Sequence, residues 1–262
     1  MNVVIFSAHT ESVFTTNLIQ RLKGSSITID GVIVRKAITY ERLREELRTS
    51  PAEAFRKISL FARRFFSKSD SGGDGFSKFA ESHGFMTTSV TKLAKHEGIP
   101  CLVVNNFNSD CVIEFLKGTE AHVGVFSGGG LIRSGLICRL KILNCHMGIL
   151  PQYRGHFPWV WAILNKDFNN IGLTVHAIDS GVDTGPILDV KFVNISGCAS
   201  TREIRSLLEY SMTNFLVEGL LKLARSGQKE DVFEAQVSSD GLQYFMPHPK
   251  LVMLANKILK ER

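Results

Sequence analysis

Short apolar runs alternate with stretches of helical apolar spacing in the first half of the chain. The runs predict strands and the spacing predicts helices, because a buried strand is short and continuous whereas a helix buries one stripe. Strands are predicted at 3–6, 29–34, 101–104, 122–126 and 141–146, and helices at 15–23, 40–47, 51–66, 87–96 and 110–116. Strands alternating with helices predict an α/β fold, a Rossmann-like, mostly parallel sheet with helices on both faces.

The pattern changes after Pro186. A strand at 187–193 precedes a capping box at 200–203, which begins a long helix that ends near Gly227. A short strand at 242–245 and a helix at 251–259 follow. We therefore predict a catalytic core over residues 1–195 and a short C-terminal helical and strand extension over residues 196–262, packed on that core. The apolar face of the long helix is either internal core or the face of a homodimer.

Composition is ordinary for a soluble globular protein, with 44% hydrophobic and 21% charged residues. No apolar run approaches the roughly 18–20 residues that span a bilayer, and the first residues read as a strand rather than a signal peptide. We expect a cytoplasmic protein with no membrane partner. The five cysteines include no Cys-x-x-Cys pair, so neither a disulfide framework nor a metal site is predicted.

The net charge is +6, which favours a polyanionic partner such as a nucleotide, RNA or a polyglutamate tail. Basic residues gather between residues 35 and 68, where the simpler interpretation is the solvated face of a helix. The polar, glycine-rich segment 67–75 is typical of a surface loop, and one alternative is a lid over a site.

The strand at 141–146 ends with an amide and an imidazole, Asn144 and His146. Side chains two residues apart on a strand lie on the same side, so both are expected to project together while Cys145 faces away. Open parallel sheets bind ligands beyond the carboxyl ends of their strands. Each residue alone is better explained as satisfied core, but the motifs that follow favour a site.

Two carboxylates lie in the turn at 179–186. Such a turn serves metal binding, catalysis or turn formation alone, and a calcium loop would need more ligands than it offers. Asp183 is the better catalytic candidate, since a carboxylate can orient an imidazole and stabilise its charge. Asp179 is expected to stabilise the turn.

Together these motifs resemble the folate-dependent formyltransferase family. The resemblance rests on Asn-x-His at 144–146, Leu-Pro-x-Tyr-Arg-Gly at 150–155 and Asp-x-Gly-x-Asp-Thr-Gly-Pro-Ile at 179–187. It implies a formyltransferase-type fold, with N10-formyltetrahydrofolate as cofactor and no metal. One departure is Gly148, where family members commonly carry Ser, so one hydrogen bond near the site is missing or supplied elsewhere.

The resemblance also assigns roles. The catalytic residues would be Asn144, His146 and Asp183. Asn144 and His146 would donate to the developing oxyanion, at about 3 kcal/mol per donor. His146 would take the proton of the attacking amine, and Asp183 would orient it. The implied folate contacts are Gly128, Gly129, Gly130, Leu131, Ile132 and Asp179.

Aromatic and basic residues near the catalytic strand suit a sugar nucleotide, because aromatic faces accept a base or a sugar and Arg binds a diphosphate. The predicted substrate contacts are Tyr153, Arg154, Gly155, Trp159 and Tyr244. For Phe157 and Trp161, core packing of a helix at 157–164 is the simpler interpretation, and for Tyr244 a half-buried strand is an equal alternative.

The acceptor is predicted by comparing the three enzymes of the family. Too little chain follows the long helix for the tRNA-binding barrel of methionyl-tRNA formyltransferase, and residues 7–12 lack the glycines of the glycinamide ribonucleotide enzyme's phosphate loop. The best match is a sugar N-formyltransferase acting on a GDP- or dTDP-linked 4-amino-4,6-dideoxyhexose, used in surface polysaccharide (lipopolysaccharide O-antigen) synthesis. Nucleic acid is not expected as a partner. The alternatives are a methionyl-tRNA formyltransferase-like enzyme without the tRNA-binding domain, a non-catalytic folate-binding protein, and hydrolysis of the formyl group.

Overall fold

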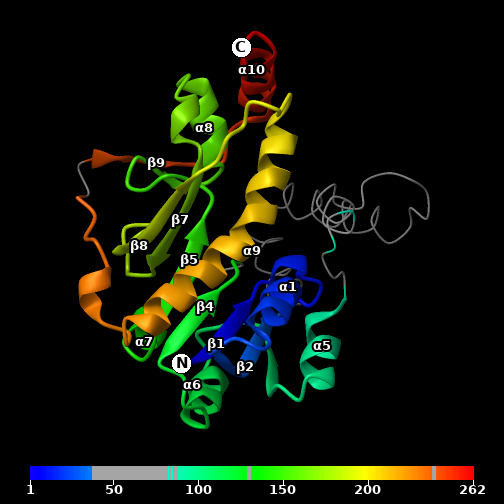
Figure 1. The fold of residues 1–262 in the computed structure, drawn as a ribbon, viewed down its shortest axis with the longest axis vertical. Coiled ribbons are helices and arrows are strands. Elements are labelled where there is room, and N and C mark those ends of the chain that lie inside the picture. Colours follow the sequence, from blue (N-terminus) through cyan, green and yellow to red (C-terminus); the bar gives the residue numbers. More distant parts are fainter. Residues whose placement is uncertain (37–81, 83, 85–87, 129–130, 238–239) are drawn as a thin grey trace, which may run out of the picture.

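The computed structural model describes residues 1–36, 82, 84, 88–128, 131–237 and 240–262. The predicted helices at 40–47 and 51–66, the loop at 67–75 and all but the first residues of the basic segment lie outside these ranges. Figure 1 shows the described elements around one central sheet.

The sheet has seven strands in the order β3-β2-β1-β4-β5-β7-β8. The strands are β1 (Asn2–Ser7), β2 (Thr28–Arg35), β3 (Cys101–Val104), β4 (Val123–Phe126), β5 (Lys141–His146), β7 (Gly172–Ala177) and β8 (Ile187–Phe192). The strands from β3 to β5 are parallel, and β7 and β8 add antiparallel strands at one edge. The predicted Rossmann-like, mostly parallel sheet is confirmed.

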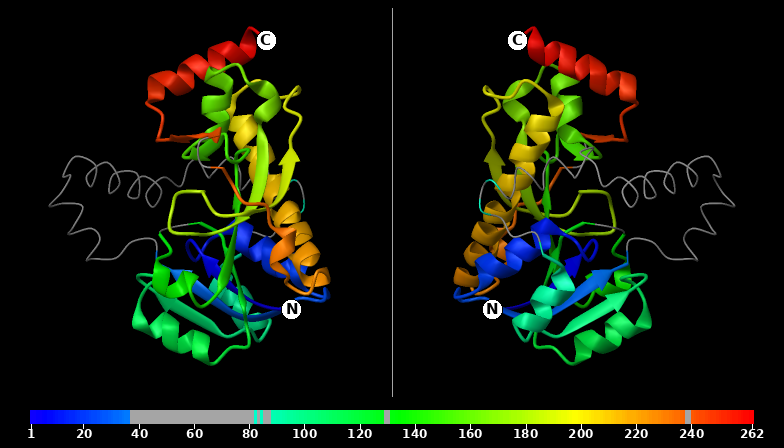
Figure 2. Two further views of the ribbon diagram at one scale, coloured as in Figure 1. Left: turned by 90° about the vertical axis from the view of Figure 1, so that its left-hand side faces the viewer. Right: turned by 90° about the vertical axis from the view of Figure 1, so that its right-hand side faces the viewer.

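Helices cover both faces of this sheet, as predicted. They are α1 (Val13–Leu22), α5 (Val90–His96), α6 (Asp110–Lys117), α7 (Ser134–Ile137), α8 (Pro158–Leu164), α9 (Thr201–Arg225) and α10 (Pro249–Lys260). Short 3-10 turns at Phe168–Asn170 and Glu230–Val232 complete the helical elements of the described residues. The side views of Figure 2 show α1 and α9 on one side of the sheet and α6 on the other.

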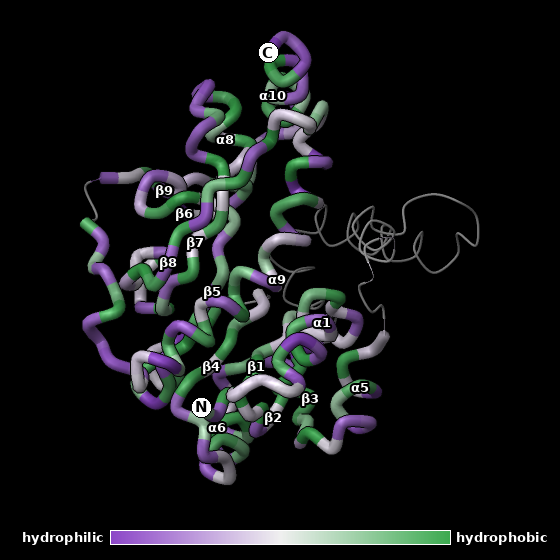
Figure 3. The backbone as a smooth tube through the Cα atoms, viewed as in Figure 1, coloured by the Kyte–Doolittle hydropathy of each residue, from purple (hydrophilic) through white to green (hydrophobic). Residues whose placement is uncertain are grey.

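The alternation of side chains along β1 explains why helices cover both faces of the sheet. Val3 and Ile5 join a core cluster with α1, α5 and α9, while Val4 and Phe6 join a second cluster with α6 and α7. Successive side chains on a strand point to opposite faces, so an unbroken apolar run must be covered on both. In Figure 3, hydrophobic colour follows β1, β2 and β4, whereas hydrophobic and hydrophilic colours alternate along α9.

The helix α9 begins at the predicted capping box. The Ser200 hydroxyl accepts from the backbone N–H of Glu203, and the Glu203 carboxylate accepts from the N–H of Ala199. Its fully buried residues Leu208, Leu216 and Leu220 pack within the chain, on the layer that also holds α1 and β7. The apolar face is therefore internal core, the first of the two alternatives. The division at residue 195 stays a prediction.

Besides the two 3-10 turns, three elements were not predicted: β7, α7 and the short strand β6 (Tyr153–Gly155). β6 pairs in parallel with β9 (Leu242–Tyr244) in a separate two-stranded sheet, so the last part of the chain lies beside residues 153–155. β7 is buried at every position although it contains Thr174 and His176. Those two polar residues interrupt the apolar run of β7, so the sequence did not predict this strand, which lies directly beside β5.

Candidate active site

A cavity of about 400 Å³ lies beyond the carboxyl ends of the parallel strands β1, β4 and β5. Its lining includes residues at or just after each of those ends, Ala8, Ser127 and His146, as well as Asn144. From the other side it is lined by the start of α1 and by Arg205, Glu209 and Met212 of α9. This is where ligands bind in open parallel sheets.

Strand register places a histidine and a threonine beside the predicted catalytic pair. β5 and β7 are antiparallel, with Asn144 opposite His176 and His146 opposite Thr174. Residues directly opposite each other on antiparallel strands share a face of the sheet. The structure thus brings Asn144 and His146 together on one face, as their spacing predicts, while Cys145 packs in the core on the other.

His176 is a neutral residue that orients Asn144. Its Nδ1 lies 2.9 Å from the Ala177 carbonyl, which can only accept, so Nδ1 carries the proton. Burial lowers the pKa of His176 to about 4, against the opposing charge of Asp183. Nε2 is therefore a lone-pair acceptor, and the amide of Asn144 at 3.1 Å must present its NH2 group. Although Asp183 lies 3.6 Å away, a neutral His176 forms no ion pair with it.

His146 has one free nitrogen. Its Nε2 donates to the Tyr153 carbonyl at 2.8 Å, which fixes the ring. Its Nδ1 faces Asp183 Oδ2 at 3.5 Å. A backbone carbonyl thus shares the orienting task that the sequence assigns to Asp183. The carboxylate instead faces the nitrogen that is able to exchange a proton.

Asp183 occupies a turn in the left-handed region, with φ of 53°. For a residue with a Cβ this backbone conformation is unfavourable and must be held by its surroundings. The backbone N–H of Gly155 donates to Oδ2 at 2.8 Å, and the Gln236 amide donates to the Asp183 carbonyl at 3.1 Å. The side chain is 17% exposed, so its carboxylate stays close to solvent while it lies between the two histidines.

The structure accounts for Gly148. A Cβ at this position would overlap the ring of Pro158 and approach the Tyr153 carbonyl to 2.8 Å. The neighbouring loop is held instead by Thr174, whose hydroxyl donates to the Gly148 carbonyl at 2.7 Å and accepts from the N–H of Leu150 at 3.2 Å. The hydrogen bonding near this position is supplied by β7.

The predicted folate segment is only partly described. Gly128 has φ of 89° and lines the cavity, whereas Gly129 and Gly130 lie outside the described residues. Leu131 is 74% exposed and Ile132 is half-buried. The Asn108 side chain donates to the Leu131 carbonyl at 2.8 Å and accepts from the next residue but one, Arg133, at 2.8 Å. Asn108 therefore holds the backbone at residues 131 and 133, where the apolar side chain of Leu131 is exposed.

Asp179 is placed inside its own turn. Its carboxylate accepts from the N–H of Gly181 at 3.0 Å and from the Thr184 hydroxyl at 2.7 Å. These contacts are those of a turn-stabilising residue. Its assignment to folate stays a prediction.

The predicted substrate contacts divide into two groups. Tyr153 and Trp159 are buried in the core, and burial raises the pKa of the Tyr153 phenol to about 12, so it donates to Asp167. Tyr244 stacks between Tyr153 and Trp161, with ring centroids 5.5 and 5.1 Å apart. The other two residues lie on β6, where Arg154 donates to the Gly241 carbonyl and Gly155 donates to Asp183. None of the five lines the cavity at Asn144.

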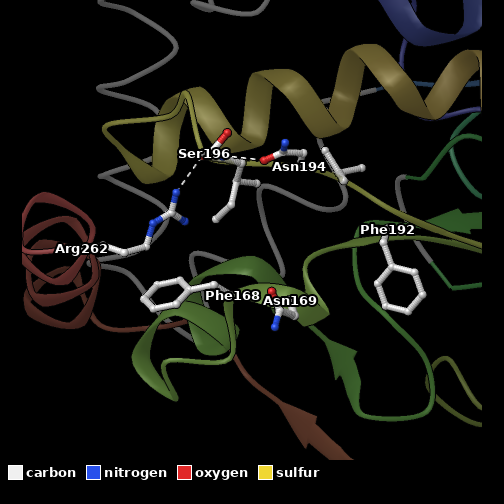
Figure 4. A pocket seen from close by; sticks show the side chains of 8 residues that line it. Phe168, Asn169, Phe192, Asn194, Ser196 and Arg262 are labelled. Atoms are coloured by element: carbon white, nitrogen blue, oxygen red, sulfur yellow. Dashed lines mark hydrogen bonds between the residues drawn. The ribbon is translucent and has the colours of Figure 1, made fainter.

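A second cavity, of about 600 Å³, lies elsewhere (Figure 4). It is lined by Phe168, Phe192, Arg262 and the residues 193–196, and no predicted site residue borders it. Its size alone does not make it a reaction centre, because it lacks the convergent acid–base groups of the smaller cavity.

Two features are absent from the described residues. No helix there is both long and apolar enough to cross a bilayer. Within the same ranges, no three His, Cys, Asp or Glu side chains are grouped so that they could bind a metal ion.

Sequence reasoning missed His176, Thr174 and Gln236. For the first two a signal exists: Leu173 and Val175 alternate with Thr174 and His176, which is typical of a strand with one polar face. Nothing local identifies Gln236, because its partners lie some fifty residues away in the sequence.

Part of the chain matches a known protein family. Residues 129–219 match a family model described as formyl transferase. This range contains Asn144, His146 and Asp183, and the match confirms the predicted resemblance to the formyltransferase family.

Similar sequences include methionyl-tRNA formyltransferases of Finegoldia magna, 28% identical over 159 residues, and Chloroflexus aggregans, 34% identical over 139 residues. These alignments cover 58% and 52% of this chain and 51% and 45% of those proteins. The aligned region spans about half the length of the curated relatives.

Similar solved structures include a sugar N-formyltransferase from a Shewanella species, with a TM-score of 0.56 and 20% identity, covering 99% of this chain and 86% of that one. Glycinamide ribonucleotide transformylase 1 from Symbiobacterium toebii has a TM-score of 0.58 and 16% identity, covering 90% and 94%. At these identities the likeness establishes the formyltransferase fold.

Proposed function

We propose that this protein is an enzyme that transfers a formyl group from N10-formyltetrahydrofolate to the amine of a nucleotide-linked amino sugar. The observation that carries the proposal is that Asn144 and His146 line a cavity at the strand ends and that Asp183 lies 3.5 Å from His146. An amide donor, an imidazole and a carboxylate are the groups that acyl transfer to an amine requires.

Each of these residues has a task that its contacts support. One N–H of Asn144 is held by His176, which leaves the other to donate to an oxygen that gains negative charge. His146 Nδ1 takes the proton of the amine, and the imidazolium is stabilised by Asp183 and by the Tyr153 carbonyl. Because Nε2 is already bound to that carbonyl, Nδ1 is the nitrogen that carries out proton transfer.

The folate segment has features that fit a pterin. Gly128 brings backbone to the cavity without a side chain, Leu131 offers an exposed apolar surface, and Asn108 binds the backbone of Leu131 and Arg133. These residues would hold the cofactor, which supplies the activated formyl group when bound. The predicted contacts Gly129, Gly130 and Ile132 continue the same segment.

The acceptor class rests on coverage and on the lining of the cavity. The Shewanella sugar N-formyltransferase structure matches 99% of this chain, including the C-terminal region, and the glycinamide ribonucleotide transformylase structure matches 90%. The lining of the cavity also includes an ion pair, Arg205 and Glu209 at 2.7 Å, which suits a ligand with phosphate and hydroxyl groups. A role in making surface polysaccharide follows from that substrate class.

A second candidate is favoured by the sequence relatives, which are named methionyl-tRNA formyltransferases. The charge of +6 would then serve phosphate contacts. Binding of the charged initiator tRNA that falls steeply with salt would support this candidate.

One experiment separates these functions. The protein is incubated with N10-formyltetrahydrofolate and, in turn, GDP- and dTDP-linked 4-amino-4,6-dideoxyhexoses, methionyl initiator tRNA, or no acceptor. We expect one amino-sugar nucleotide to gain the mass of a formyl group. Transfer only to the tRNA would replace the proposal, formate without acceptor would indicate hydrolysis, and folate binding with no product would indicate a non-catalytic protein. His146→Ala is the control for enzyme-dependent transfer.

A further inference from the structure

The described residues 234–237 and 240–245 are here called the strap. The strap binds the turn that carries Asp183 and the strand β6, which contacts His146. The strap lies outside residues 129–219, the range that matches the family model. It belongs to the predicted extension, which the sequence treats as a segment packed on the core rather than as part of the site.

One end of the strap binds the turn that carries Asp183. Glu234 and Ile187 exchange two backbone hydrogen bonds of 2.7 Å. Two residues further on, the Gln236 amide nitrogen lies 3.1 Å from the Asp183 carbonyl and 2.5 Å from the Gly185 carbonyl. The strap thus binds the turn at Asp183 and Gly185 and also at Ile187, where the turn ends.

The orientation of the Gln236 amide follows from its partners. Both are carbonyl oxygens, which only accept, so the NH2 group must face them. The amide oxygen Oε1 is buried and has no partner among the described residues. A buried, unpaired acceptor is unfavourable. The two hydrogen bonds that the NH2 group of Gln236 donates offset this cost.

The other end of the strap binds β6. The Tyr244 carbonyl accepts from the N–H of His156 at 2.9 Å, and the Gly241 carbonyl accepts from Arg154 at 3.1 Å. Gly155 and Gly241 permit this close approach, since a Cβ on Gly155 would overlap the Tyr244 carbonyl and one on Gly241 would overlap the Pro151 carbonyl. β6 is the strand whose Tyr153 carbonyl holds His146 and whose Gly155 N–H holds Asp183.

We propose that the strap sets the separation of His146 and Asp183, and that Gln236 is a positioning residue for the Asp183 carboxylate. One end of the strap fixes the backbone of Asp183 in its left-handed conformation. The other end fixes β6, the strand whose Tyr153 carbonyl binds His146 and whose Gly155 N–H binds Asp183. The role in formyl transfer rests on the proposed function, whereas the effect on the His146–Asp183 pair does not.

The test compares Gln236→Met with Gln243→Met. Both replace a glutamine of the strap by an apolar side chain of similar length, but Gln243 is exposed on β9 and has no role in the proposal. The probe reaction is formyl transfer from N10-formyltetrahydrofolate to dTDP-4-amino-4,6-dideoxyglucose. For Gln236→Met we expect kcat to fall about tenfold, KM to stay within twofold, and the kcat profile to move to lower pH, because the carboxylate facing His146 is displaced. Gln243→Met keeps the wild-type values.

A second measurement needs no substrate. Ring 15N signals of His146, assigned with His146→Ala, are followed against pH in the wild type and both variants. Movement of these signals in Gln236→Met alone supports the strap as a positioning element, even if the wild type transfers no formyl group and the proposed function fails. Identical His146 signals in all three proteins would overturn the inference. So would a loss of activity in Gln236→Met with an unchanged pH profile.

Discussion

The two halves of the site are held in different ways. The strand half consists of Asn144, His146 and His176 on the neighbouring strands β5 and β7, where register alone places them on one face. The loop half consists of Asp183, which occupies an unfavourable backbone conformation and depends on Gly155 and Gln236. Strands supply fixed geometry, whereas the loop half must be assembled from segments distant in sequence.

The largest effect is expected where the two halves meet. His146→Ala removes the proton acceptor, and Asp183→Asn removes the charge that stabilises its protonated form. Each should lower kcat about a thousandfold while folate binding changes little. Single-turnover rates and folate titrations measure both quantities. Near-normal turnover in both variants would refute the catalytic assignment.

Gly155→Ala tests how far the loop half depends on backbone packing. The residue has φ of 94° and its added Cβ would overlap the Tyr244 carbonyl. We expect a loss of about 3 kcal/mol in the free energy of unfolding and a drop in kcat of about a hundredfold. Urea unfolding and steady-state kinetics give the two values. Gly197→Ala, where a Cβ meets nothing within 4 Å, serves as the control.

His176→Met tests the strand half. Methionine fills the space but gives Asn144 no strong acceptor, so one amide N–H loses its partner. We expect kcat to fall about tenfold with KM unchanged. If kcat is unaffected, the Asn144 amide is oriented by other contacts.

The stability of the strand half should depend on pH. His176 has a pKa of about 4 when folded, below its value of about 6.5 in the unfolded chain, so the unfolded state binds the extra proton between those pH values. This stabilising contribution is complete above pH 6.5 and decreases as the pH falls towards 4, by about 3 kcal/mol in total. Urea unfolding at several pH values measures it. His176→Met should show a shallower decrease than the wild type, and an equal decrease would contradict the assignment.

The smallest effect is expected at Asp179. Its carboxylate binds Gly181 and Thr184 within the turn, so Asp179→Asn should lower stability by about 1 kcal/mol and kcat only a few-fold. A rise in the KM for folate of tenfold or more would instead favour the predicted folate contact. Kinetics at varied folate concentration decide between them.

The strand half was largely predictable and the loop half was not. β5 was predicted with its observed bounds, and period two correctly placed Asn144 beside His146. β7 was missed because buried polar residues interrupt its apolar run. Tyr153 was predicted to use its aromatic ring, but it contributes a backbone carbonyl to His146, and such a contact does not depend on residue type. The three-residue strands β6 and β9 form only because distant segments meet, which no local pattern encodes.

The contact between His146 Nε2 and the Tyr153 carbonyl has a consequence for turnover. Many catalytic imidazoles receive a proton on one nitrogen and release another from the opposite one, so that charge travels through the ring. Here the second nitrogen, Nε2, is hydrogen-bonded to a backbone carbonyl, which cannot pass a proton on, so His146 cannot relay a proton through its ring. In the proposed reaction, the proton taken from the amine would leave by the edge through which it arrived, past Asp183 and into water. Because the Asp183 side chain is 17% exposed, this edge of the ring already has a path to solvent.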